Sequence, residues 1–66
     1  MKIQLNGNER HIEPGTTLKQ LIENEGMAGK RLAAEVNHEI ITKTQHPSFV
    51  LKDGDIIEIV HAIGGG

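Results

Sequence analysis

The chain has 66 residues, no cysteine, a single aromatic residue, Phe49, and a net charge of −2. These values favour one small domain with an aliphatic core, and they exclude disulfide bonds and cysteine-ligated metals. The acidic balance and the lone aromatic side chain argue against a nucleic-acid-binding surface. No apolar run resembles a transmembrane helix or a signal-peptide core, so we expect a cytoplasmic protein.

The N-terminal residues predict a β-hairpin. Ile3 and Leu5 alternate with polar residues, which indicates a strand with one buried face. Asn6-Gly7 favours a type I′ turn, because both central positions of that turn need positive φ. A second strand is therefore expected over residues 9–13.

A short helix is expected next. Thr17 and Gln20 have the spacing of a capping box, and Gly26 is suited to the left-handed residue after the helix end. Met27 would then contact the last apolar turn of the helix. The apolar stripe of this helix comprises Leu18, Leu21 and Ile22.

The remainder of the chain predicts three further strands, over residues 32–36, 40–43 and 56–62. They are separated by turns at 37–39 and 52–55 and by an irregular segment at 44–49, which has room for one helical turn.

This order of strands and helix is typical of the ubiquitin-like β-grasp layout. We therefore predict an α+β fold in which one helix packs across one face of a mixed four- to five-stranded sheet. The first and last strands would lie side by side in the middle of the sheet. The domain would span residues 1–63, followed by a flexible glycine tail at 64–66.

The sequence lacks the motifs of a catalyst. It has no P-loop, no G-x-G-x-x-G and no H-E-x-x-H, and its one serine, Ser48, is not in a G-x-S-x-G motif. Asp53-Gly54-Asp55 is interpreted as a turn, because a calcium loop needs many more oxygen ligands. The widely spaced histidines are expected at the surface, and not as metal ligands: His11, His38, His46 and His61. We therefore expect neither a metal site nor a bound cofactor.

The glycine tail is the remaining candidate for function. Gly64, Gly65 and Gly66 directly follow the predicted central strand. Such a tail can be mere fraying or a cloning remnant. Here it would project from a rigid platform, and three extended glycines reach about 10 Å. A tail without side chains can enter a narrow tunnel and place the α-carboxylate of Gly66 in another protein's active site. Because this chain has no nucleotide-binding loop, ATP for activating that carboxylate would be bound by a partner.

Motifs along the whole chain carry a family resemblance. They are Ile3-Gln4-Leu5-Asn6-Gly7, Thr16-Thr17-Leu18 with Leu21-Ile22, Val36-Asn37 with Ile40-Ile41, Leu51 with Asp53-Gly54-Asp55, Ile57-Glu58-Ile59-Val60-His61, and Gly65-Gly66. With them the chain resembles the thiamine-biosynthesis sulfur carrier family of β-grasp proteins. One departure is the third glycine, Gly64, since many members end in two.

The resemblance implies a carrier that is not itself an enzyme. A ubiquitin-activating-like adenylyltransferase would adenylate Gly66, and sulfur from a persulfide enzyme would displace AMP to leave a thiocarboxylate. Thiazole synthase would then take the sulfur to build the thiazole ring of thiamine. No nucleic acid and no membrane are implied as partners.

The resemblance further implies that the open face of the sheet docks on both partners together with the tail. By strand parity, Ile57 and Ile59 should face the helix while the alternate residues face outward. The predicted partner-binding residues are Glu58, Val60, Ala62 and Ile63.

Alternatives remain open at this point. The chain could be the small subunit of molybdopterin synthase, or a sulfur carrier for tRNA thiolation or another cofactor. A different class is the RNA-binding β-grasp module of the type appended to tRNA synthetases. A third is an interaction module with an inert tail, or a tag conjugated to lysines.

Overall fold

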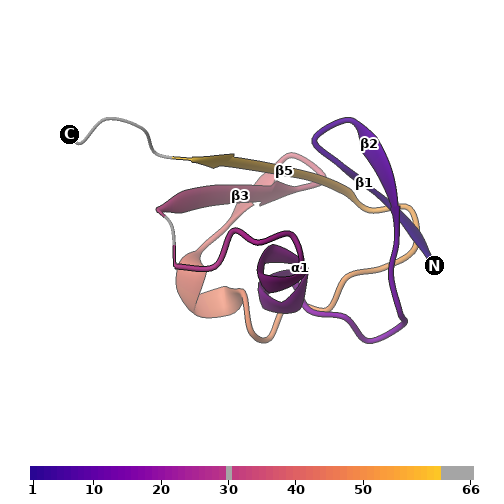
Figure 1. Ribbon diagram of the computed structural model, residues 1–66, viewed down its shortest axis with the longest axis horizontal. Helices are drawn as coiled ribbons and strands as arrows, with labels where there is room; N and C mark the ends of the chain where they lie inside the picture. The colour runs from indigo at the N-terminus through magenta and orange to yellow at the C-terminus, as the bar shows by residue number, and fades with distance from the viewer. Residues whose placement is uncertain (30, 62–66) are drawn as a thin grey trace.

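The computed structural model describes residues 1–29 and 31–61. The elements are β1 (Lys2–Leu5), β2 (Asn8–His11), α1 (Leu18–Asn24), β3 (Leu32–Val36), β4 (Glu39–Ile41), a 3₁₀ helix η1 (Lys43–Gln45) and β5 (Ile56–His61) (Figure 1). The strands form one sheet in the order β2-β1-β5-β3-β4. In its centre β5 runs parallel to β1 and antiparallel to β3. The predicted mixed sheet, with the first and last strands adjacent and one helix across one face, is confirmed.

Local sequence signals account for the hairpin and for both ends of α1. Asn6 and Gly7 both have positive φ, 49° and 83°, as a type I′ turn requires. The capping box is formed in both directions, since the Gln20 amide N–H donates to the Thr17 hydroxyl and the Thr17 amide donates to the Gln20 side chain. After the helix, the Met27 amide donates to the carbonyl of Ile22 at 3.0 Å, the long hydrogen bond of a Schellman motif.

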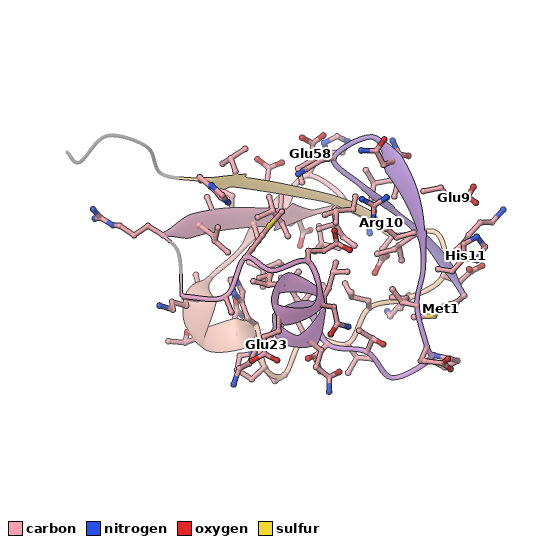
Figure 2. The ribbon with its side chains drawn as sticks, in the orientation of Figure 1. Met1, Glu9, Arg10, His11, Glu23 and Glu58 are labelled. Atoms are coloured by element: carbon pink, nitrogen blue, oxygen red, sulfur yellow. The ribbon has the colours of Figure 1, made fainter. Side chains whose placement is uncertain are left out.

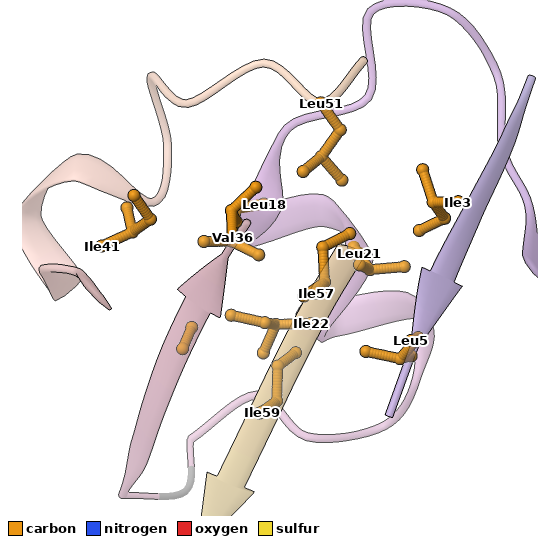
Figure 3. Packing of buried hydrophobic residues seen from close by; sticks show 11 residues of the cluster. Ile3, Leu5, Leu18, Leu21, Ile22, Val36, Ile41, Leu51, Ile57 and Ile59 are labelled. Atoms are coloured by element: carbon orange, nitrogen blue, oxygen red, sulfur yellow. The ribbon is translucent and has the colours of Figure 1, made fainter. Parts of the chain in front are cut away.

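A single core fills the space between the sheet and α1 (Figure 3). Its buried residues are Ile3, Leu5, Leu18, Leu21, Ile22, Ala34, Val36, Ile41, Leu51, Ile57 and Ile59. All are aliphatic, as the composition predicts. Leu18 and Ile57, from α1 and β5, are fully buried. The central strand and the helix therefore hold each other in place.

Some element boundaries differ from the prediction. β2 ends at His11, although Ile12 still exchanges backbone hydrogen bonds with Met1. β4 ends at Ile41, because the next residue, Thr42, caps η1. The turn before β4 has two residues with positive φ, Asn37 and His38, so that residue 39 already belongs to the strand.

The expected exposure of His46 is wrong. Its side chain is buried, and its ring Nε2–H donates to the carbonyl of Ile41 at 3.0 Å. The reason is that its own carbonyl accepts the Lys19 amide, which ties the segment after η1 to the start of the helix. Sequence spacing carries no signal for this contact. In the described part of the chain, no helix is both long enough and apolar enough to cross a bilayer.

Candidate functional site

Gly66, which is predicted to react, lies outside the described residues, as do the tail residues Gly64 and Gly65 and the predicted partner-binding residues Ala62 and Ile63. The structure describes the strand from which they continue. His61, the last residue of β5, pairs with Leu32 of β3. The site is therefore built here from β5 and from the sheet face beside it.

The predicted parity of β5 is confirmed. Ile57 and Ile59 are buried against α1, whereas Glu58 and Val60 point to the opposite face of the sheet. Figure 2 shows Glu58 on the side of β5 away from α1. Val60 is 58% exposed, which is a large value for a valine in a central strand. The sheet thus presents an apolar side chain one residue before its last described position.

Strand register extends this apolar surface. Ala33 of β3 lies directly opposite Val60 and is also exposed. Two isoleucines on the same face, Ile40 and Ile56, are 72% and 39% exposed. We call the four residues Ala33, Ile40, Ile56 and Val60 the outer apolar set. Alternation within each strand indicates which of them face outward, but the sequence does not give the pairing between strands.

Two carboxylates lie within the outer apolar set. Glu35 of β3 is directly opposite Glu58 of β5, and Ile40 of β4 is opposite Glu35. Like charges facing each other across strands destabilise a sheet. A cation supplied by another molecule would relieve this repulsion. The face therefore has the chemistry to receive a basic side chain surrounded by apolar ones.

The Asn6 side chain holds β5 on its β1 side. Strand pairing between β1 and β5 ends at Leu5 and Ile57. Beyond it, the Asn6 side-chain amide donates to the carbonyl of Ile59 at 3.1 Å, and its Oδ1 accepts the Ile59 amide at 2.8 Å. These two hydrogen bonds take the place of those that a further residue of β1 would make to β5. Sequence reasoning identified Asn6 only as a turn residue, because nothing local reveals a partner 53 positions away.

A second asparagine holds the start of β5 on its other side. The Ile56 amide donates to Asn37 Oδ1 at 2.9 Å, and Asn37 Nδ2 donates to Asp55 Oδ1 at 2.9 Å. Asp55 is buried, and its other oxygen accepts the amide of Lys52. The Asp-Gly-Asp segment is thus a turn, as predicted, and Asp55 fixes its geometry. The strand is therefore held by side-chain hydrogen bonds at its first residue, Ile56, and at Ile59.

Replacing Asn6 by glycine is expected to lower the free energy of unfolding by about 1–2 kcal/mol, the sum of two partly buried hydrogen bonds. Glycine keeps the positive φ of this turn position, so the change isolates the side-chain amide. The urea midpoint should fall with an unchanged slope, and the Ile59 amide should exchange its hydrogen faster. An unchanged urea midpoint together with unchanged exchange at Ile59 would contradict this role for Asn6.

In residues 1–29 and 31–61, no group of three histidine or acidic side chains converges to hold a metal ion. His11 contacts Glu9 at 3.1 Å on the exposed edge strand β2, an ordinary surface pair. The chemically distinctive features of the described chain are therefore the central strand β5, which the side chains of Asn6 and Asn37 hold by hydrogen bonds, and the exposed sheet face beside it.

The chain is similar to known proteins in sequence and in structure. The chain is 42% identical over its full length to a protein named thiazole synthase from Magnetococcus marinus, and it spans 20% of that relative's length. It is 38% identical to the sulfur carrier protein ThiS of Thermus thermophilus, covering 97% of this chain and 98% of that one. A crystal structure of the thiamine biosynthesis protein ThiS from Geobacter metallireducens matches with a TM-score of 0.85 over all of both chains at 23% identity, which supports the fold. The model of the ThiS family matches residues 3–66. The chain therefore belongs to the ThiS family.

Proposed function

We propose that this chain carries sulfur for thiazole synthesis as a thiocarboxylate on Gly66. The supporting observation is that β5, the central strand held by Asn6 and Asn37, ends three residues before the first glycine of the tail in the sequence. Family membership and full-length relatives named as sulfur carriers support the same function. In this role the chain is a protein co-substrate, and partner enzymes supply the catalytic groups.

The proposed chemistry needs a free α-carboxylate at Gly66. A carboxylate oxygen attacks the α-phosphorus of ATP held by an adenylyltransferase, and pyrophosphate leaves. A persulfide sulfur of a donor enzyme then attacks the acyl carbon and AMP leaves. A thiolate of the partner next attacks the sulfur of the resulting acyl disulfide that belongs to the donor enzyme, and the S–S bond breaks. This releases the thiocarboxylate and leaves a disulfide on the partner side.

We propose the outer sheet face as the surface that docks on these partners. Val60 and Ala33 lie next to the end of β5, and the Glu35–Glu58 pair lies two residues before them, so a partner that takes the tail also meets this face. Glu58 and Val60 lie on this face, whereas Ala62 and Ile63 lie outside the described residues, and the partner-binding role of all four stays a prediction. A relative named thiazole synthase contains a segment similar to this whole chain, which supports that enzyme as the sulfur acceptor.

Intact-mass measurement on protein from its native cell tests the proposal. We expect a fraction of molecules in which one oxygen at Gly66 is replaced by sulfur, and we expect that fraction to rise with activating enzyme, ATP and a sulfur donor. Omitting ATP is the matched control, because the carboxylate cannot become a good acyl donor without adenylation. A mass that never changes under the complete conditions would refute the carrier function.

The names of the relatives favour the thiamine pathway over molybdopterin or tRNA thiolation. The pathway is tested by supplying the thiocarboxylate form separately to thiazole synthase and to the large subunit of molybdopterin synthase. We expect sulfur loss only with the first enzyme. Cytoplasmic location stays a prediction, testable by cell fractionation.

A further inference from the structure

A second surface lies on the helix side of the sheet, between α1, the start of β3 and the segment around η1. It is a groove of about 720 Å³, within the size range of ligand sites. Its apolar lining includes Ile22, Leu32 and Pro47. Ile22 is buried and Leu32 half-buried, so the groove reaches the edge of the core.

The charged lining of this groove is mostly cationic. Lys19, Arg31 and Lys43 all line it and all are exposed. They are three of the seven cationic residues of a chain whose net charge is −2. Among residues 1–29 and 31–61, none of the three forms an ion pair with a carboxylate. One carboxylate, Glu23, shares the lining.

The groove and the outer sheet face lie on opposite sides of the sheet, and both lie near the end of β5. Figure 2 shows Glu23 on the α1 side and Glu58 beyond the sheet. Leu32, which lines the groove, is paired with His61 at the end of β5. A partner that binds around the end of β5 therefore contacts an acidic, apolar surface on one side of the sheet and a basic, apolar groove on the other.

We propose that the groove binds an acidic segment of the adenylyltransferase that receives the tail, with an apolar side chain of that segment against Ile22 and Leu32. This inference rests on the proposed function. Charge complementarity selects an acidic occupant, because three cations without carboxylate partners in the described chain surround an apolar surface. The one Phe, Tyr or Trp of the chain, Phe49, packs against the core and does not line the groove, so the groove lacks the aromatic platform typical of single-stranded RNA binding.

The first test uses the full-length protein and a capped peptide of alternating glutamate and leucine as probe. In NMR titrations, amides of residues 19–23, 28–29, 31–32 and 43–46 should shift, while those of Ala33, Glu58 and Val60 should not. A matched peptide with lysine in place of glutamate should leave the groove amides unmoved. Equal shifts with both peptides, or shifts confined to the outer face, would overturn the proposal.

Charge reversal supplies the second test. Lys43→Glu should weaken peptide binding about fivefold and raise the KM for thiocarboxylate formation by a similar factor with kcat unchanged. Lys52→Glu is the matched control, because it makes the same charge change away from the groove. The peptide effect should also shrink at high salt, because exposed ion pairs are screened. Equal effects of the two variants would refute a specific site.

Two other occupants are distinguished in the same experiments. A single-stranded RNA oligonucleotide that binds the groove more tightly than the peptide would overturn the proposal in favour of a nucleic acid. A dimer in sedimentation that Lys43→Glu dissociates would overturn it in favour of a second copy of the chain. Failure of the carrier function appears as wild-type protein without a mass gain. Failure of the groove proposal appears as a normal mass gain with a wild-type KM in Lys43→Glu.

Discussion

Removing Gly65 and Gly66 together is expected to abolish thiocarboxylate formation while leaving the free energy of unfolding unchanged. The loss shortens the maximum reach of the tail by about 7 Å. Displacing a reacting group by about 1 Å can already cost about a hundredfold in rate, so we expect a fall of at least that size. The buried core extends only from Ile3 to Ile59, which is why the fold should not change.

The matched control removes a single glycine. Because Gly64, Gly65 and Gly66 are identical, removing any one of them gives the same chain, which ends in Ile63-Gly-Gly. This is the diglycine end that the family resemblance implies, so activity should stay within about tenfold of wild type. Intact mass measures product, and circular dichroism with urea titration measures stability. Unfolding of the two-glycine deletion would contradict a purely chemical role for the tail.

Two neighbouring residues of β5 should separate stability from docking. Ile59 is 4% exposed against the core, whereas Val60 is 58% exposed on the outer face. Ile59→Ala is expected to cost about 2–5 kcal/mol, a large share of the stability of so small a domain. Val60→Ala should change stability by no more than about 0.5 kcal/mol.

Docking is then tested with Val60→Asp, which leaves the core intact and adds a charge to an apolar contact. It should raise the KM for thiocarboxylate formation about tenfold or more, the effect of losing a central interface residue. Lys52→Asp is a surface control in the turn before β5, at the opposite end of the strand from Val60. Urea titration checks that both variants remain folded. A wild-type KM for folded Val60→Asp protein would refute docking through this face.

The elements that sequence reasoning predicted well are those specified by neighbours in the chain. Thr17 with Gln20 specifies the start of α1, Gly26 its end, and Asn6-Gly7 the first turn. Boundaries were wrong where one residue serves the next element, as Thr42 does for η1. The burial of His46 was missed because it depends on a hydrogen bond to β4 and a backbone bond to α1.

The candidate site was predicted only along β5. Alternation gave the outward direction of Glu58 and Val60, but Ala33 and Glu35 join them through the β3–β5 register. The groove needs α1, η1 and the start of β3 together, and its cations are distant from one another in the sequence. Contacts of that kind follow from tertiary packing, which local patterns do not encode.

The position of β5 also affects how the protein is made. Among the strands that the structure describes, β5 is synthesised after the other four and its neighbour β1 before them, so this sheet can close only after Ile56–His61 have emerged. Pairings between distant parts of a chain form late and slowly. A nascent or truncated chain without β5 would hold two separate hairpins and an uncovered core, which is a substrate for chaperones and proteases. Chaperones and proteases therefore act on chains that lack β5, whereas every copy that reaches the folded state already contains the strand from which the tail continues.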